Sequence, residues 1–211
     1  MRTKFDQQLD ALSRRLIQMG SLCETVIDLA ARAVVLKQPE LAREIPAHSA
    51  GIRQAARDSE GMCMQLLLRQ QPVAGDLRHI SAALKMVTDM QRIGDQAEDM
   101  AEIIGIMPMT LKDDCMPIDD MAKQARAMVT ASVDAFVDKN VSLAQQVTDR
   151  DEAVDQGLCQ VRAALIRRIA GEPDCGEEAL DLYMIAKYFE RIADHAVNIA
   201  GWVRYSVTGQ Q

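Results

Sequence analysis

The chain has 211 residues, of which 48% are hydrophobic and only 3% aromatic, with 13 methionines, 11 glycines and 6 prolines. A chain of this length can bury a sizeable core, and the scarcity of glycine, proline and aromatic residues favours helices over sheets. The formal net charge of −7 argues against a nucleic-acid partner, because binding a phosphate backbone needs a basic surface. We therefore expect an all-α protein that binds no nucleic acid.

The N-terminal half of the sequence predicts three helices. Apolar residues recur at helical spacing over residues 5–27, and this first helix is expected to end before Pro39. A second helical pattern runs over about 40–69 and stops at the breaker 70–72, which contains a proline. A third pattern covers about 75–107.

The same order of helices returns after a linker at residues 109–117. Helices are predicted at about 121–137, then from a break at Asn140 to Arg168, and finally from Glu177 onward. Each half therefore has two breaks and three helices.

The third helix of each half carries the clearest internal similarity, because Arg92-Ile93-Gly94-Asp95 matches Arg191-Ile192-Ala193-Asp194. A repeat of about 100 residues is typical of a duplicated supersecondary unit. It predicts two tandem three-helix bundles, one at residues 1–107 and one at 117–207. The alternative is a single irregular array of six helices with a chance match.

The cysteines and the hydrophobic pattern bear on location. The five cysteines form no CxxC pair and are odd in number, so they predict neither a disulfide framework nor a zinc site. The start of the sequence lacks the apolar run of a signal peptide, and no stretch approaches the length of a membrane span. We expect a cytoplasmic protein with no membrane insertion.

Two motifs connect this sequence with a known family. The third helices carry Leu84-Lys85, Asp89, Gln91-Arg92-Ile93-Gly94-Asp95 and Ala97 in the first half, and the run Phe189 to Ala200 in the second; the lead-in to the first reads Gln70-Gln71-Pro72-Val73-Ala74-Gly75-Asp76-Leu77-Arg78. They resemble the patterns LKxxxDxERIGDxAxNIA and QQPVAxDLR of the PhoU family. The resemblance spans nearly the whole chain.

The resemblance implies a cytoplasmic regulator of phosphate uptake and of the phosphate-starvation response that is not an enzyme. PhoU proteins are usually dimeric adaptors between a phosphate ABC transporter and the sensor histidine kinase of the phosphate two-component system, and they keep the phosphate regulon off when phosphate is ample. The expected partners are therefore a second copy of this chain, the transporter ATPase and the kinase.

The resemblance also implies metal binding, since some PhoU proteins hold metal clusters at an E/DxxxD motif. In the second repeat Glu190 and Asp194 keep this motif, and residues four apart on a helix can present oxygens to one hard cation. Asn198 extends the same side by one turn, and Asp151 and Asp155 are again four apart on the preceding helix. The expected cofactors are divalent or iron-type metal ions.

The spacing alone leaves another interpretation of these carboxylates. A helical wheel places Glu190 and Asp194 opposite the apolar stripe of their helix, where they face solvent or a partner. An acidic surface needs no metal, because like charges at this spacing cost only about 0.2–0.5 kcal/mol.

The first repeat departs from the metal pattern. Gln91 stands where the family has Glu, and Ser49 and Arg53 take the places of the two aspartates of the preceding helix. An amide is a weak neutral ligand and a guanidinium repels a cation. Asp95 and Asp99, together with Glu98, remain as a poorer candidate site, so we expect any metal to bind more tightly in the second repeat.

Other polar residues are expected to be structural. Asp89 lies near the apolar stripe, where a carboxylate needs a partner, and we expect an Arg or Lys from a neighbouring helix. His48, His79 and His195 do not form the ExxH spacing of diiron bundles and are interpreted as ordinary residues.

Two other classes of function compete with the regulator. One is a metal-binding helical bundle without a transporter link. The other is an enzyme such as a phosphatase, which needs a nucleophile or a paired-metal centre, whereas the sequence contains no Gly-rich phosphate loop, HExxH or GxSxG motif.

Overall fold

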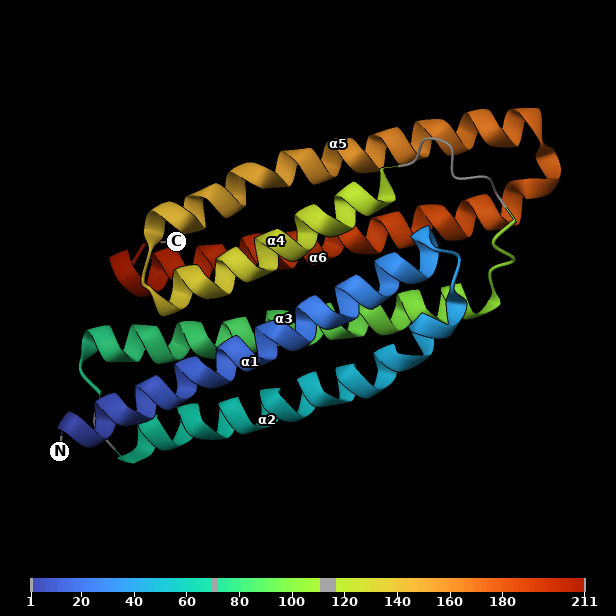
Figure 1. Ribbon diagram of the computed structural model, residues 1–211. Coiled ribbons are helices and arrows are strands. Elements are labelled where there is room, and N and C mark those ends of the chain that lie inside the picture. The colour runs from blue at the N-terminus through green and yellow to red at the C-terminus, as the bar shows by residue number, and fades with distance from the viewer. Residues whose placement is uncertain (1, 70–71, 111–116, 211) are drawn as a thin grey trace.

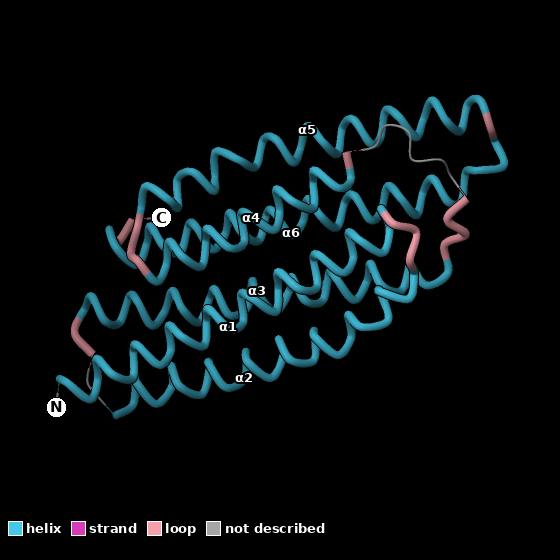
Figure 2. Tube along the Cα trace, in the orientation of Figure 1, coloured by secondary structure: helices cyan, strands magenta, loops and turns pink. Residues whose placement is uncertain are grey.

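The computed structural model describes residues 2–69, 72–110 and 117–210, and within these ranges the chain is helical with no strand (Figure 2). The α-helices are α1 (Arg2–Val35), α2 (Ile45–Arg69), α3 (Ala74–Ile106), α4 (Ile118–Val137), α5 (Val141–Gly171) and α6 (Gly176–Thr208). Two short 3₁₀ helices, η1 (Pro39–Glu44) and η2 (Pro173–Cys175), precede α2 and α6. The all-α prediction is confirmed.

The helices form two bundles that lie side by side along their length (Figure 1). Helices α1, α2 and α3 form the first bundle, and α4, α5 and α6 form the second. The bundles meet where α3 packs against α6 and α1 packs against α4. Helix α6 contacts α4 and α5 as well as α3, so it is enclosed on several sides.

The breaks between helices follow local chemistry. In both repeats a lysine with positive φ follows the end of the first helix by two residues, Lys37 at 54° and Lys139 at 53°. Asn140 then caps α5, because its side chain accepts a hydrogen bond from the backbone N–H of Leu143 at 3.0 Å. The second predicted helix starts later than expected, at Ile45, since the segment from Pro39 forms the 3₁₀ turn η1 first.

The core is continuous across the two bundles. Its largest fully buried side chains come from both halves and include Phe136, Phe189, Leu16 and Met90. Helices α1 and α4 approach closely at Gly20, where an added Cβ would lie 3.2 Å from the Cγ2 of Val133. None of the helices in the described ranges is both long and apolar enough to cross a bilayer.

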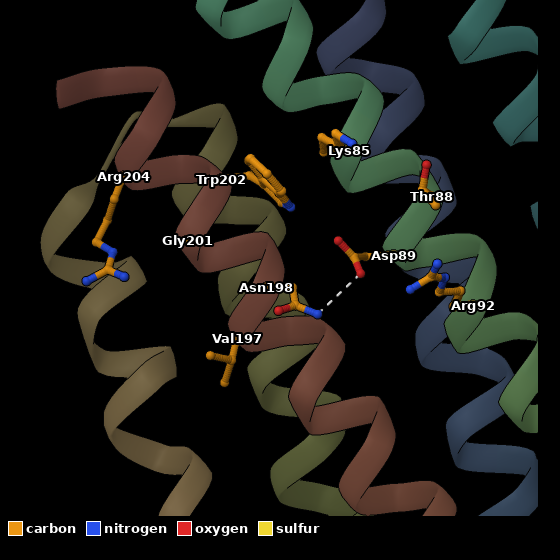
Figure 3. Close-up of a pocket in the computed structure, with 9 residues that line it drawn as sticks. All are labelled: Lys85, Thr88, Asp89, Arg92, Val197, Asn198, Gly201, Trp202 and Arg204. Atoms are coloured by element: carbon orange, nitrogen blue, oxygen red, sulfur yellow. Dashed lines mark hydrogen bonds between the residues drawn. The ribbon is translucent and has the colours of Figure 1, made fainter. Parts of the chain in front are cut away.

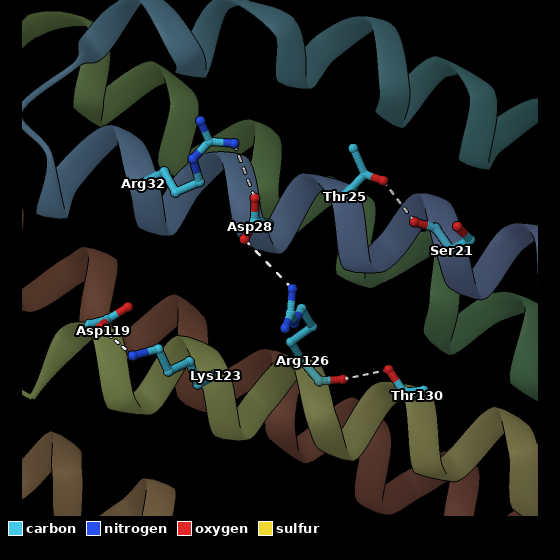
Figure 4. A network of polar contacts seen from close by, with 8 residues as sticks. All are labelled: Ser21, Thr25, Asp28, Arg32, Asp119, Lys123, Arg126 and Thr130. Atoms are coloured by element: carbon cyan, nitrogen blue, oxygen red, sulfur yellow. Dashed lines mark hydrogen bonds and ion pairs between the residues drawn. The ribbon is translucent and has the colours of Figure 1, made fainter.

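A chain of polar contacts also connects the two bundles at their surface (Figure 4). Asp28 of α1 pairs with Arg32 at 3.4 Å and with Arg126 of α4 at 3.6 Å. These side chains are 41% to 51% exposed, and exposed ion pairs contribute about 0–1 kcal/mol each. The contact between the bundles therefore depends mainly on the buried apolar side chains.

Candidate functional site

Four carboxylates gather where α5 packs against α6. Asp151 and Asp155 stand one turn apart on α5, and Glu190 and Asp194 stand one turn apart on α6. Three of them, Asp194, Asp155 and Glu190, lie close enough to Asp151 to act on its charge. We call these four residues the acidic cluster.

The acidic cluster raises the pKa values of its own members. Burial, followed by repulsion from Asp194, Asp155 and Glu190, raises the pKa of Asp151 from 3.8 to about 6. Burial and the charge of Glu190 likewise raise the pKa of Asp194. Part of the negative charge is therefore unfavourable in the cluster when no cation is bound.

Glu190 is buried, with 9% of its surface exposed, and this corrects the expectation that it faces solvent or a partner. The helical wheel treated α6 as a helix with one covered face, whereas α3, α4 and α5 all contact it. The Lys187 ammonium donates to Glu190 Oε1 at 2.5 Å. Asp194, one turn further on, is exposed.

Two buried oxygens of the cluster lack a protein partner. Glu190 Oε2 and Asp151 Oδ1 are shielded from solvent and accept no hydrogen bond. Buried polar atoms are rarely left unpaired, and a hard cation is the natural partner for two such carboxylate oxygens. In their present rotamers, no group of three His, Cys, Asp or Glu side chains in the described ranges is arranged to hold a metal ion. The cluster therefore offers oxygen donors of the kind that a divalent metal prefers, without an assembled metal site in the described ranges.

The first repeat carries its own cation at the matching place. Arg53 of α2 donates from its two terminal nitrogens to Glu98 Oε2 at 2.7 Å and Oε1 at 2.9 Å. Its Nη1 also lies 3.7 Å from Asp95 Oδ1. The guanidinium thus offsets the carboxylates of this repeat from within the protein. Ser49, one turn before it, donates to the carbonyl of Gly94 at 3.2 Å.

Asp89 has different partners from those expected. It is buried, and its Oδ1 lies 3.0 Å from His195 Nδ1 and accepts a hydrogen bond from Asn198 Nδ2 at 3.4 Å. The prediction of an Arg or Lys partner for Asp89 is therefore wrong. The interpretation of His195 as an ordinary residue is corrected as well, because its ring pairs with Asp89 across the two bundles. Asn198 turns toward Asp89 (Figure 3), so the structure does not place its amide among the acidic-cluster carboxylates.

The internal repeat contains a signal for this contact. Positions 99 apart correspond in the third helices, as Arg92 and Arg191 do. By this offset Asp89 matches Tyr188, and Asn198 matches Asp99. Tyr188 and Asp99 do interact, because burial and then the Asp99 carboxylate raise the pKa of Tyr188. Two related contacts therefore join α3 to α6, and Asp99 takes part in one of them.

Comparison with known proteins agrees with these motifs and this fold. The family model of the PhoU domain matches residues 16–104 and 118–203. A Synechocystis protein named phosphate-specific transport system accessory protein PhoU homolog is 32% identical over 213 residues, covering 100% of this chain and 94% of that protein. A Clostridium acetobutylicum protein of the same name is 30% identical, covering 98% and 95%.

The structural similarity is equally extensive. The crystal structure of PhoU from Pseudomonas aeruginosa superposes with a TM-score of 0.91 at 29% identity, covering 98% of this chain and 100% of that one. Both halves match the same domain, and the similarity extends over the full length. The chain is therefore a member of the PhoU family.

Proposed function

We propose that this protein is a cytoplasmic accessory regulator of phosphate uptake without enzymatic activity, and that it acts as an adaptor between a phosphate ABC transporter ATPase and a sensor histidine kinase. The observation that supports the proposal is the full-length similarity to proteins named phosphate-specific transport system accessory proteins. In this role the chain keeps the phosphate-starvation response off when phosphate is ample.

Deleting the gene tests this role. Under ample phosphate, the deletion strain should express a phosphate-starvation reporter that the parent strain keeps silent, and the intact gene should restore silence. A reporter that stays silent in the deletion strain would contradict the regulatory role. Co-purification of the tagged chain with the transporter ATPase and with the kinase then tests the two contacts separately.

A homodimer is part of the proposal, since closed two-fold pairs are the commonest oligomers. Sedimentation of the purified chain at micromolar concentration should give twice the mass of one chain, which is 23.3 kDa. A single species with the mass of one chain would contradict it.

A second function, metal binding at the acidic cluster, has its own support in the two buried unpartnered oxygens of Glu190 and Asp151. Carboxylates and water would complete the shell of a cation such as Mn²⁺ or Mg²⁺. The second repeat should bind more tightly than the first, because Glu190 and Asp194 supply two carboxylates whereas the Gln91 and Asp95 pair supplies one, which Arg53 already contacts.

Matched double variants test which repeat binds metal more tightly. Manganese is titrated by calorimetry into chelator-treated protein carrying Glu190→Ala with Asp194→Ala, or Gln91→Ala with Asp95→Ala. The first variant should lose most of the heat of binding and the second should keep it. Equal losses, or a larger loss in the first-repeat variant, would show that the number of carboxylates does not decide where the metal binds.

Asp151→Asn gives a second signature of the metal. Because the raised pKa means that the folded state disfavours the Asp151 carboxylate, the neutral amide should stabilise metal-free protein at pH 7, by about 1 kcal/mol after allowance for solvent screening. With manganese the sign should reverse, since the variant loses an anionic ligand. Urea unfolding in chelator and in manganese measures both effects. If Asp151→Asn changes the free energy of unfolding equally in the two conditions, metal binding at this residue is contradicted.

A further inference from the structure

A groove of about 480 Å³ lies between α3 and α6, beside the contact of Asp89 with Asn198 (Figure 3). Lys85, Thr88 and Arg92 line it from α3, and Trp202 and Arg204 line it from α6. It is separate from the acidic cluster, which lies between α5 and α6. We call it the basic groove.

The basic groove concentrates positive charge in an acidic protein. Lys85, Arg92 and Arg204 line it, although the chain as a whole has a formal charge of −7. Across the described ranges, no carboxylate lies within 4.0 Å of any of these three cations, and Arg204 Nε is buried without a hydrogen-bond partner. The groove carboxylate Asp89 is already bonded to His195 and Asn198.

The groove also offers a flat aromatic surface. Trp202 is half-buried, and its indole receives the Lys85 ammonium at 5.8 Å from the ring centroid. Next to it Gly201 lines the groove, and a Cβ added there would have no heavy atom within 4 Å. The space in front of the α6 backbone at Gly201 is thus open to a ligand.

The opposite end of the contact between α3 and α6 does not share this chemistry. By the same offset of 99 residues, Lys85 matches Met184, Gly201 matches Glu102 and Arg204 matches Gly105. Two cations are lost there, and Lys187 in place of Thr88 restores only one of them. Carboxylates stand at three of the matching positions, Glu98, Asp99 and Glu102. The basic groove is therefore not a by-product of the repeat, since only one of two related positions has gathered the charge.

We propose that the basic groove binds a nucleoside phosphate, with the phosphate oxygens on Arg92 and Lys85 and the base against Trp202. Guanidinium and ammonium groups are the usual protein ligands of phosphate, and an indole face is a good stacking surface for any base. A groove of this volume lies within the range of small-molecule sites and has room for more than one phosphate group. The inference concerns a site that the proposed function does not use, and it stands or falls independently of that function.

The single tryptophan of the chain makes the test direct, because Trp202 lies in the groove and reports on it alone. Tryptophan emission of the full chain is recorded while ATP is added, with chelator present so that no metal at the acidic cluster contributes. We expect a saturable change. Arg92→Gln should weaken binding at least about tenfold, the loss of about one charge-assisted contact, and Gly201→Leu, which fills the open space, should abolish it.

Arg191→Gln is the matched control. Arg191 is the repeat counterpart of Arg92, is exposed on α6 and packs over Tyr188 with its guanidinium 5.9 Å from the ring centroid, so its loss should leave ATP binding unchanged. Calorimetry repeats the comparison without fluorescence.

Four results would overturn the proposal. The first two are the absence of a saturable signal with ATP, and equal weakening by Arg92→Gln and Arg191→Gln. The third is saturation by orthophosphate or by adenosine at the same concentration as by ATP, and the fourth is saturation by an acidic peptide at that concentration. The last would assign the groove to a protein partner instead.

Discussion

At the scale of single residues, burial determines how His79 behaves. His79 of α3 is 9% exposed and stacks on Phe136 of α4, with ring centroids 4.4 Å apart and an interplanar angle of 12°. Burial, and then repulsion from Lys139, lowers the pKa of His79 from 6.5 to about 4. The folded protein therefore holds this ring neutral at pH values where the unfolded chain protonates it.

This shift predicts a loss of stability in mild acid. The stabilisation is fully present above the unfolded pKa of 6.5 and is lost as the pH falls toward the folded pKa of about 4. Between pH 7 and pH 5, His79 alone should lower the free energy of unfolding by about 2 kcal/mol. Urea unfolding at the two pH values measures it.

The variant His79→Phe isolates this residue, because phenylalanine keeps a ring against Phe136 but does not titrate. Between pH 7 and pH 5 the variant should lose about 2 kcal/mol less free energy of unfolding than the parent does, whatever its absolute stability. His48→Gln, which removes a partly exposed histidine, serves as the control. An identical loss in the parent and in His79→Phe would show that His79 is not held neutral.

At the scale of helices, the two bundles are joined by close backbone approach as well as by side chains. At Gly20 of α1 an added Cβ would lie 3.2 Å from Cγ2 of Val133 on α4, and a β-branched valine has little freedom to move aside. Gly61, in contrast, is exposed on α2, with no heavy atom within 4 Å of an added Cβ.

These two glycines form a matched pair for a test of packing. Leucine is a better helix former than glycine at both positions. Gly20→Leu should nevertheless lower the free energy of unfolding by about 1–3 kcal/mol through overpacking between α1 and α4, whereas Gly61→Leu should not lower it. The comparison uses chemical unfolding of both variants. A Gly20→Leu protein as stable as Gly61→Leu would mean that the two bundles separate at this point without cost.

Periodicity predicted most of the helices because it depends on neighbours in the sequence. The breaks at Pro39, Asn140 and Pro173 all proved to separate helices. The helical wheel failed at Glu190, since it cannot show which other helices pack on a given face, and α5 covers the side that was expected to be open. The partners of Asp89 were missed for a similar reason, because they lie more than 100 residues away, at His195 and Asn198.

At the scale of the whole molecule, duplication has produced two halves with the same architecture and different electrostatics. In the second half, the acidic cluster leaves carboxylate oxygens of Glu190 and Asp151 unpaired. In the first half, Arg53 neutralises Glu98 and Asp95 at the corresponding place. The internal guanidinium offsets negative charge between the second and third helices of the first bundle, and the metal ion that we propose would do the same in the second.

This comparison predicts that the first half can be converted into a metal site. Arg53→Asp together with Gln91→Glu removes the internal cation and restores the carboxylates found at the matching positions Asp155 and Glu190. Made in a background of Glu190→Gln and Asp194→Asn, which disables the acidic cluster, the double change should restore manganese binding. Without metal the converted protein should be less stable than its background, because it gathers like charges and loses the bidentate pair of Arg53 with Glu98.

Manganese calorimetry and thermal unfolding, with and without the metal, measure both effects. Arg53→Gln in the same background is the control, since it removes the guanidinium without adding a carboxylate and should bind metal far more weakly. Circular dichroism establishes that each variant is still helical. A folded converted protein that binds no more manganese than the Arg53→Gln control would show that the guanidinium is not what separates the two halves. The buried position of Ser49, bonded to the Gly94 carbonyl where the second half has Asp151, would then be the difference that matters.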